Sequence, residues 1–214
     1  MKKNAPFYTS NIEEVESEIF NATRRDFLRL GSILSGGLIL GVSFWSCDSA
    51  GKKTGTLSTT AYLSISDTGE VTIVAHRSEM GQGIRTSLPL VVADELGADW
   101  SKVKIIQAEG DEKKYGNQNT DGSFSIRMFY KPMREAGAMA KAMLLEAAAK
   151  AWGLPIAELD TENGQVIHKG TDKKAGFGEF AGAAASLAVP KAESLQLKAD
   201  NQFNLIGKDT PIID

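Results

Sequence analysis

Short segments with the character of β-strands open the globular region of the chain. Residues 61–66 and 71–75 alternate between apolar and polar side chains, and the intervening DTGE segment, residues 67–70, is typical of a turn. Residues 103–107 (VKIIQ) are again rich in β-branched side chains. We therefore expect a β-hairpin followed by a third strand.

Two longer segments have helical character. In residues 85–97 the apolar positions form one helical face that ends at Gly97, and Pro89 can sit in the first turn. Residues 125–152 are rich in Ala, Met and Leu and predict a long helix. Pro132 should either kink this helix or mark its true first turn.

The pattern after the long helix predicts a smaller part. Residues 159–168 favour a hairpin that turns at Asn163-Gly164, and residues 176–188 favour a short helix. The order strand-strand-helix-strand-helix, followed by this β-rich part, indicates an α+β fold. We expect a two-layer domain over residues 61–200, with a mixed β-sheet and with the long helix and shorter helices on one face.

The N-terminal region has the layout of a targeting segment. Arg24 and Arg25 are followed by an uncharged run from Leu30 to Cys47, and the order Arg-Arg-x-Phe-Leu resembles a twin-arginine export signal. The run could also form a transmembrane helix, although its glycines and serines weaken its hydrophobicity. It has no polar face, which argues against a soluble amphipathic helix. We expect residues 1–47 to direct export to the periplasm.

Cys47 stands where a lipoprotein signal places its acylated cysteine. Ser46 supplies the usual small residue before that cysteine, whereas Phe44 departs from the usual leucine. Cys47 is therefore a candidate for lipidation and membrane attachment, and the alternative is an unmodified thiol in a discarded peptide. Residues 48–60 are small and polar and predict a linker.

Composition narrows the function classes. Of the 214 residues, 42% are hydrophobic and 24% charged, which excludes a disordered chain and a multi-span membrane protein. The net charge of −3 gives no electrostatic basis for binding nucleic acid. One cysteine excludes an internal disulfide and a cysteine-only metal cage, and His76 and His168 lie far apart, so we expect no metal site.

The first candidate site is the loop Glu79-Met80-Gly81-Gln82-Gly83, which precedes the first helix. Gly81 and Gly83 let the backbone approach a ligand, and Gln82 offers donor and acceptor groups. The loop should also present free N–H groups at a helix start, where an anion is favoured. Most Gly-x-Gly pairs are simply turns, so the loop alone is a weak signal.

The second candidate site is the loop that opens the long helix. Thr120, Ser123 and Ser125 supply hydroxyls and Gly122 supplies an accessible backbone, a combination that can bind phosphate at a helix N-terminus. The alternative is ordinary helix capping by Ser123 or Ser125. Asp121 should point outward, because it would otherwise repel an anion. Both loops precede helices that follow the same sheet, so both can open on one edge.

Four ordered motifs resemble the molybdenum hydroxylases of the xanthine dehydrogenase and aldehyde oxidase family, over about residues 60–210. Their order, behind a twin-arginine signal, is most like large (beta) subunits of the isoquinoline 1-oxidoreductase type. The motifs are residues 79–86 (EMGQGIRT), 93–96 (ADEL), 120–127 (TDGSFSIR) and 134–138 (REAGA).

The resemblance implies a cofactor, a reaction and partners. It implies that Gly81, Gln82 and Gly83 hold the molybdopterin part of a molybdopterin cytosine dinucleotide. It implies that a loop of four further residues holds the phosphates, and that molybdenum adds a water-derived oxygen to an N-heterocycle or an aldehyde. Electrons would leave through a small subunit that bears two [2Fe-2S] clusters. The four phosphate-loop residues are Thr120, Gly122, Ser123 and Ser125.

The chain also departs from the family pattern. Asp121 stands where the family often has glycine, and Phe124 where it often has arginine. No residue matches the catalytic glutamate of the family, and we interpret Glu79 and Glu95 as structural. Residues 201–214 look like the lead-in to a following domain, so we expect the first part of a catalytic subunit rather than a complete enzyme.

Two other functions stay open at this point. An exported binding module could keep the fold without a complete active site, and a lipid-anchored structural protein could bind no ligand at all.

Overall fold

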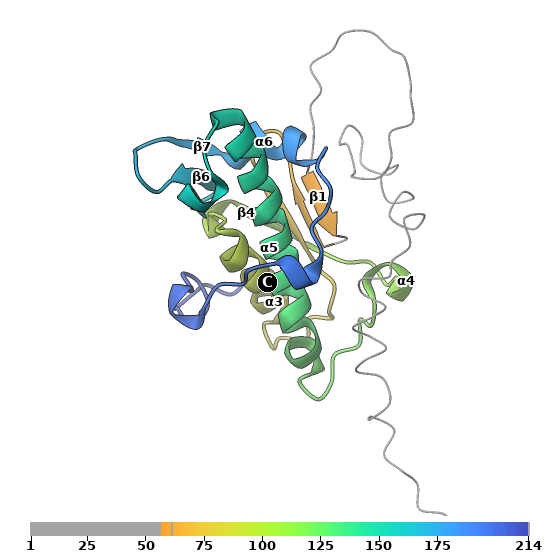
Figure 1. Cartoon of the computed structure of the whole chain (residues 1–214). Coiled ribbons are helices and arrows are strands. Elements are labelled where there is room, and N and C mark those ends of the chain that lie inside the picture. The colour runs from red at the N-terminus through yellow and green to blue at the C-terminus, as the bar shows by residue number, and fades with distance from the viewer. Residues whose placement is uncertain (1–56, 61, 214) are drawn as a thin grey trace, which may run out of the picture.

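A four-stranded sheet lies under a layer of helices in the computed structural model, which describes residues 57–60 and 62–213 (Figure 1). In this sheet β1 pairs antiparallel with β2 and β2 antiparallel with β3, whereas β3 and β4 are parallel. The α+β class and the mixed sheet are confirmed. The sheet order is β1 (Leu57–Thr60), β2 (Leu63–Ile65), β3 (Val71–Ala75) and β4 (Val103–Gln107).

The helices come from both halves of the domain. The main pair, α3 (Ile84–Leu96) and α5 (Phe124–Trp152), packs on one face of the sheet. Beside them lies a second antiparallel sheet with the order β5-β6-β7. Its strands are β5 (Leu159–Glu162), β6 (Gln165–His168) and β7 (Lys174–Gly176). The shorter helices of the described residues are α4 (Glu112–Tyr115) and α6 (Phe177–Ala184), with four 3₁₀ turns at Trp100–Lys102, Ile156–Glu158, Ala192–Ser194 and Asp200–Gln202.

Several boundaries differ from the sequence expectation. Residues 57–60, expected as linker, form β1 and pair with β2, because two threonines and a leucine suit a strand once a partner is present. Pro89 lies in the second turn of α3 rather than the first. Of the two alternatives for Pro132, the one that made it the first turn of the helix is wrong, because Pro132 lies inside α5. The expectations for Arg24, Arg25, Cys47 and the preceding part of the linker fall outside the described residues.

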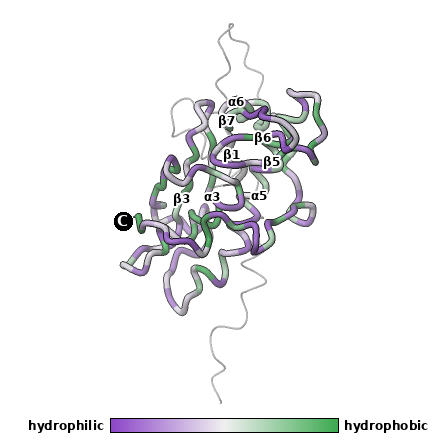
Figure 2. The backbone as a smooth tube through the Cα atoms, turned by 90° about the vertical axis from the view of Figure 1, so that its left-hand side faces the viewer, coloured by the Kyte–Doolittle hydropathy of each residue, from purple (hydrophilic) through white to green (hydrophobic). Residues whose placement is uncertain are grey.

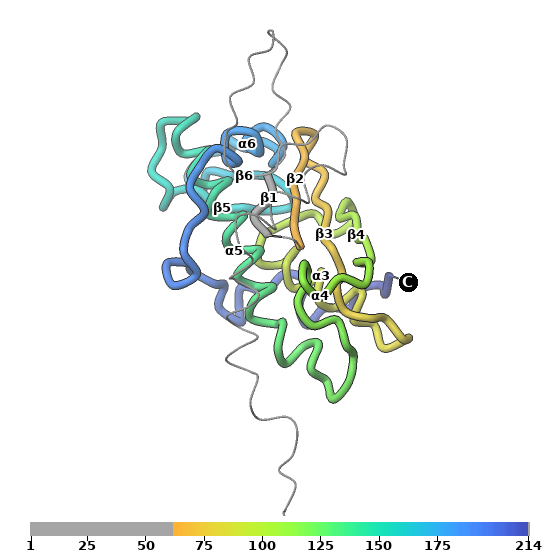
Figure 3. The backbone as a smooth tube through the Cα atoms, turned by 90° about the vertical axis from the view of Figure 1, so that its right-hand side faces the viewer, coloured from red at the N-terminus to blue at the C-terminus, as the bar shows by residue number. Residues whose placement is uncertain are grey.

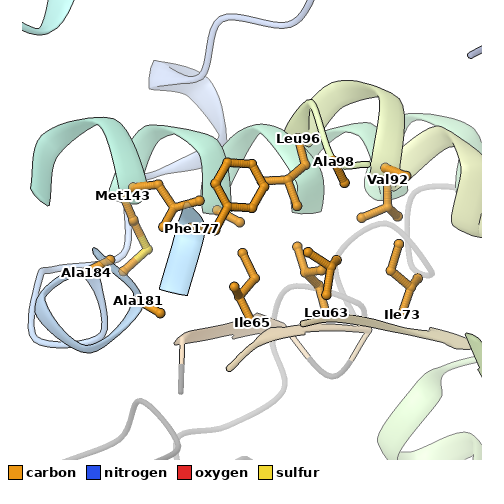
Figure 4. Packing of buried hydrophobic residues seen from close by; sticks show 14 of the residues in the cluster. Leu63, Ile65, Ile73, Val92, Leu96, Ala98, Met143, Phe177, Ala181 and Ala184 are labelled. Carbon is orange, nitrogen blue, oxygen red and sulfur yellow. The ribbon is translucent and has the colours of Figure 1, made fainter. Parts of the chain in front are cut away.

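The core lies between the four-stranded sheet and the two main helices. Leu63, Ile65 and Ile73 point from the strands toward Val92 and Leu96 on α3 (Figure 4). All five are almost fully buried. Burying a side chain of this size contributes about 1.5–3 kcal/mol, so this layer is a major source of the stability.

Hydrophobic and hydrophilic residues are interspersed along the backbone (Figure 2), and α3 is buried around most of its circumference. In the part of the chain that the structure describes, no helix has both the length and the apolar character needed to cross a bilayer.

Gly137 sets the distance between α3 and α5. A Cβ atom at this position would lie 2.6 Å from the Val92 carbonyl oxygen and 2.9 Å from the Glu95 Cβ. Both distances are shorter than real contacts allow, so only glycine lets the two helices cross this closely.

Replacing Gly137 with alanine should destabilise the protein by about 1–3 kcal/mol, because the added methyl group must push two packed helices apart. Chemical denaturation of both proteins measures the difference. Gly176→Ala is the matched control, since Gly176 has φ −66 and nothing within 4 Å of the added Cβ. Equal stability of the two variants would contradict the close crossing.

His76 is fully buried directly after β3. Its ring packs between Tyr62, in a tilted contact with centroids 4.7 Å apart, and Phe129, in an edge contact with centroids 4.4 Å apart. Neither ring nitrogen has a hydrogen-bond partner among the described residues. Burial, together with the nearby Arg77 charge, lowers the pKa of His76 to about 3. The imidazole is therefore neutral in the folded protein.

A buried neutral histidine makes stability depend on pH. Below the ordinary histidine pKa of about 6.5, His76 binds a proton in the unfolded chain but stays neutral in the folded chain. The free energy of unfolding therefore falls as the pH drops from 6.5 toward 3. The loss is about 1.4 kcal/mol per pH unit. Denaturation at several pH values should show that His76→Phe removes this component, whereas His168→Asn leaves it. Parallel pH profiles for wild type and His76→Phe would refute the assignment.

Candidate functional site

The two candidate loops lie at the same edge of the four-stranded sheet. β3 and β4 are parallel, so their carboxyl ends meet there, and ligands commonly bind outside such ends. Residues 76–83 lead from β3 into α3, and residues 108–123 lead from β4 into α5. Both loops lie toward the lower end of the molecule in Figure 3. The expectation that they open on one edge is confirmed by the hydrogen bonds between them, described below.

The first loop wraps around the carboxylate of Glu79. Its Oε1 accepts hydrogen bonds from the N–H groups of Gly81 at 2.7 Å and Gly83 at 3.0 Å, and Oε2 accepts one from Arg85 at 2.8 Å. A further N–H, from Met80, donates to Oε1 at 3.1 Å. The loop was expected to offer free N–H groups to an anion, and for these four that expectation is wrong: the chain's own carboxylate occupies them.

These bonds fix the charge of Glu79. The N–H of Arg85 is the largest influence that lowers the pKa of Glu79, and it is joined by the N–H groups of Gly83, Gly81 and Met80, which outweigh partial desolvation. Glu79 is therefore ionised and structural, as interpreted from the sequence.

The Gln82 side chain forms hydrogen bonds within the loop, whereas no other residue covers the backbone of the two neighbouring glycines. The Gln82 Oε1 accepts from the Met80 N–H at 2.6 Å, and its Nε2 donates to the Ser78 carbonyl at 3.0 Å. Gly81 and Gly83 have φ values of 91° and 83°, which favour glycine, and a Cβ at either would meet nothing within 4 Å. The loop thus presents open backbone surface to its surroundings.

The second loop is held by Arg77, which follows β3 and is 1% exposed. The Arg77 Nε donates to the Ser125 Oγ at 3.0 Å, and Nη1 donates to the Asn117 side-chain oxygen at 2.6 Å and also to the Asn117 carbonyl. Its guanidinium stacks 5.0 Å from the Phe129 ring centroid. Arg77 therefore ties the end of β3 to both ends of the segment that precedes α5.

Further hydrogen bonds join the loops directly. The Thr120 Oγ1 donates to the Ser78 carbonyl at 2.9 Å and lies 3.4 Å from the Ser125 Oγ, and the Ser78 Oγ donates to the Gln118 carbonyl at 3.1 Å. Residues from both loops therefore form one site at the sheet edge.

The predicted residues of the second loop take different positions. Ser125 is buried and bonded to Arg77, whereas Ser123 and Gly122 are exposed with φ values of 61° and 46°. Capping of α5 by a serine side chain was the alternative, and the Ser123 side chain makes no cap hydrogen bond. Asp121 is exposed, and its carboxylate is close enough to influence the Arg77 charge.

Arg77 is the residue that sequence reasoning missed. It lies between a strand and a glycine-containing loop. It is buried only because the fold brings Asn117, 40 residues further along the chain, into contact with it. No local pattern signals this burial, because an arginine that follows a strand is usually exposed.

The ADEL motif lies away from this edge, at the last turn of α3. Buried Asp94 accepts the Lys198 ammonium at 2.8 Å and the N–H groups of Asn204, Leu205 and Ile206 at 3.2, 3.0 and 2.9 Å. Burial acts to raise the pKa of Asp94, but these bonds, led by that of Ile206, hold it below the ordinary value. Asp94 thus anchors a segment without regular structure.

Glu95 extends this anchor to α5. Its Oε2 accepts from the Arg134 Nε at 2.8 Å and its Oε1 from the Lys198 N–H at 2.6 Å. The Glu95 carboxylate is structural, as interpreted. At the other end of α3, the Ile213 N–H donates to the Thr86 Oγ1 at 2.7 Å. The segment 204–213 therefore runs along α3 from its last turn to its first, which lies at the candidate site.

A comparison with protein families matches residues 14–211 to the molybdopterin cofactor-binding domain. The match spans most of the chain, and the chain belongs to this family. It corresponds to a portion of the large subunit of a molybdenum hydroxylase, so the resemblance inferred from the four motifs is confirmed.

Three curated relatives carry the comparison further. The beta subunit of isoquinoline 1-oxidoreductase from Brevundimonas diminuta is 30% identical over 91% of this chain and 30% of that protein. A membrane-bound aldehyde dehydrogenase [pyrroloquinoline-quinone] of Gluconacetobacter polyoxogenes is 34% identical over 72% of this chain and 20% of its own length. A nicotinate dehydrogenase subunit of Pseudomonas putida is 32% identical over 72% and 13%. The chain thus spans under a third of each relative.

Glu79→Ala should destabilise the protein by about 1 kcal/mol at neutral pH, because four N–H groups lose an ionised acceptor that is partly open to solvent. The pKa of Glu79 is lowered in the fold, so its contribution is complete above the ordinary glutamate pKa and is lost as the pH falls through the folded value. The difference from wild type should therefore shrink in acid.

Thermal unfolding of both proteins at pH 7 and pH 3 tests this expectation. Glu162→Ala, which removes an exposed carboxylate on β5, is the control and should change little at either pH. A Glu79→Ala effect that is equal at both pH values would show that the charge of Glu79 does not hold the loop.

Proposed function

We propose that the sheet-edge site binds molybdopterin cytosine dinucleotide in the large subunit of an exported molybdenum hydroxylase. The observation that carries the proposal is the joining of the two motif loops by the Thr120–Ser78 and Arg77–Ser125 hydrogen bonds. Because the loops are joined, one extended ligand can contact both. Membership of the molybdopterin cofactor-binding domain family supports the same ligand class.

The residues of the two loops fit different parts of such a ligand. The bare backbone at Gly81 and Gly83 faces open space and suits the flat ring system of a pterin, and each end of the Gln82 amide retains hydrogen-bonding capacity. The Ser125 hydroxyl, with exposed backbone at Gly122 and Ser123, suits phosphate oxygens at the start of α5, whereas the Thr120 hydroxyl donates to the Ser78 carbonyl and holds the loop. Because Glu79 already accepts the N–H groups of the first loop, we assign the phosphates to the second loop.

The reaction and the partners are proposed for the whole assembly. Bound molybdenum cofactor supplies the chemistry of inserting a water-derived oxygen at a carbon of the substrate. Isoquinoline and nicotinate, in the names of two relatives, support an N-heterocycle, and the third name supports an aldehyde. Two of the relatives are themselves named as subunits, which supports a separate small subunit, and we propose that it carries two [2Fe-2S] clusters.

This chain supplies cofactor-binding groups and no catalytic residue in the proposal. The remaining part of the large subunit would supply the substrate pocket and the catalytic glutamate, since the chain spans under a third of its relatives. We propose periplasmic export by the twin-arginine pair Arg24-Arg25, with Cys47 as a membrane attachment point.

Gly81→Val should abolish molybdenum retention in the native assembly purified from its own cells. Gly81 has φ 91, which a β-branched residue rarely adopts, and the valine side chain would cover the bare backbone offered to the pterin. Elemental analysis of the purified protein measures molybdenum per chain. Gly207→Val is the matched control, because Gly207 also has positive φ and open surroundings but lies in the segment beyond the Asp94 anchor.

Two results would contradict the proposal. One is unchanged molybdenum content in Gly81→Val. The other is extraction of pyrroloquinoline quinone instead of a pterin from the wild-type assembly, a result that the name of one relative makes worth testing.

A further inference from the structure

Arg77 is a buried cation without an ion pair. Its side chain is 1% exposed, and the salt bridges among the described residues do not include it. Its neighbours are the hydroxyl of Ser125, the amide and carbonyl oxygens of Asn117 and the Phe129 ring. A buried charge of this kind is costly unless an opposite charge compensates it.

One donor atom of Arg77 also lacks a partner. Nη2 is buried and makes no hydrogen bond within the described part of the chain, whereas Nε and Nη1 both do. The guanidinium is planar, and its Nε–H lies parallel to one N–H of Nη2. The edge that reaches Ser125 therefore presents a second, unused donor in the same direction, so a group bonded to Nη2 would lie beside the Ser125 hydroxyl.

The Ser125 hydroxyl, which lies on the same edge of Arg77, can donate its hydrogen to a ligand. Because Arg77 Nε donates to the Ser125 oxygen, the Ser125 hydrogen is left to point elsewhere. Thr120 already donates its own hydrogen to the Ser78 carbonyl, so the 3.4 Å contact between Ser125 and Thr120 uses the Ser125 hydrogen in a long bond. A phosphate oxygen near this hydroxyl would accept a stronger one.

We infer that Arg77 is a binding residue for the diphosphate of the ligand, with its unpartnered Nη2 and the Ser125 hydroxyl facing one phosphate group. This inference deepens the proposed function and rests on it. It assigns the charge recognition of the site to the end of β3, across from the loop that supplies the hydroxyls. Asp121 and Glu112, whose carboxylates act on the Arg77 charge from a greater distance, are the groups that a bound diphosphate would oppose.

The test is titration calorimetry of the 214-residue chain with inorganic pyrophosphate and, separately, with the isolated molybdopterin dinucleotide. Arg77→Met should weaken pyrophosphate binding tenfold or more, since the cation and its charge-assisted Nη2 donor are lost. Arg77→Lys should fall between Met and wild type, because it keeps the charge without the fork. Lys150→Met, which removes an exposed cation from the far end of α5, should bind within about twofold of wild type.

If circular dichroism shows that Arg77→Met does not fold, Asp121→Asn is the second variant that tests the inference. Asp121 is exposed, and removing its charge should tighten pyrophosphate binding while leaving the fold unchanged. Equal affinity of Arg77→Met or Arg77→Lys and wild type, or an Asp121→Asn affinity equal to wild type, would overturn the inference.

The experiment separates the inference from the proposed function. Binding of the dinucleotide by wild type and by Arg77→Met with equal affinity would overturn the role of Arg77 and leave cofactor binding standing. Binding of the dinucleotide but not of pyrophosphate by wild type would do the same. Failure of wild type to bind either ligand would overturn both.

Discussion

The close crossing of α3 and α5 at Gly137 is the constraint on which the rest of the molecule depends. Without a side chain at this position, the helices approach until backbone meets backbone, and the Glu95–Arg134 ion pair fixes their rotation nearby. Since α3 follows β3 and α5 follows β4, this crossing keeps both helix starts above the same carboxyl edge of the sheet. Helix packing in the core thereby determines where two loops meet at the surface.

Local sequence patterns predict most of the fold and the position of the site. Alternating apolar positions identify β3, and apolar content identifies α3 and α5, although both helices are buried over more than one face. The strand β1 has the pattern of a linker, since its Ser-Thr-Thr sequence is polar and becomes a strand only through pairing with β2. The burial of Arg77 and the capture of loop N–H groups by Glu79 depend on loop conformation and on contacts between distant segments, which no local pattern encodes.

The two loops handle charge in opposite ways. The first neutralises its own N–H groups internally with the Glu79 carboxylate, and so presents an electrostatically quiet surface at Gly81 and Gly83. The second contacts Arg77, which follows β3, only through neutral groups, and so leaves this cation without a counterion in direct contact among the residues that the structure describes. A ligand with an uncharged ring at one end and a dianionic linkage further along matches this division, and a uniformly charged ligand does not.

The Asp94 carboxylate binds the segment 204–206 through its backbone N–H groups. Three successive N–H groups, from Asn204, Leu205 and Ile206, converge on one carboxylate, and each would do so with almost any side chain attached. The path of this segment is therefore specified by α3 rather than by the segment itself. Leu205 and Ile206 also pack against the core, so loss of the Asp94 carboxylate would strip three N–H groups of their acceptor while apolar contacts and the Ile213–Thr86 bond still hold the segment.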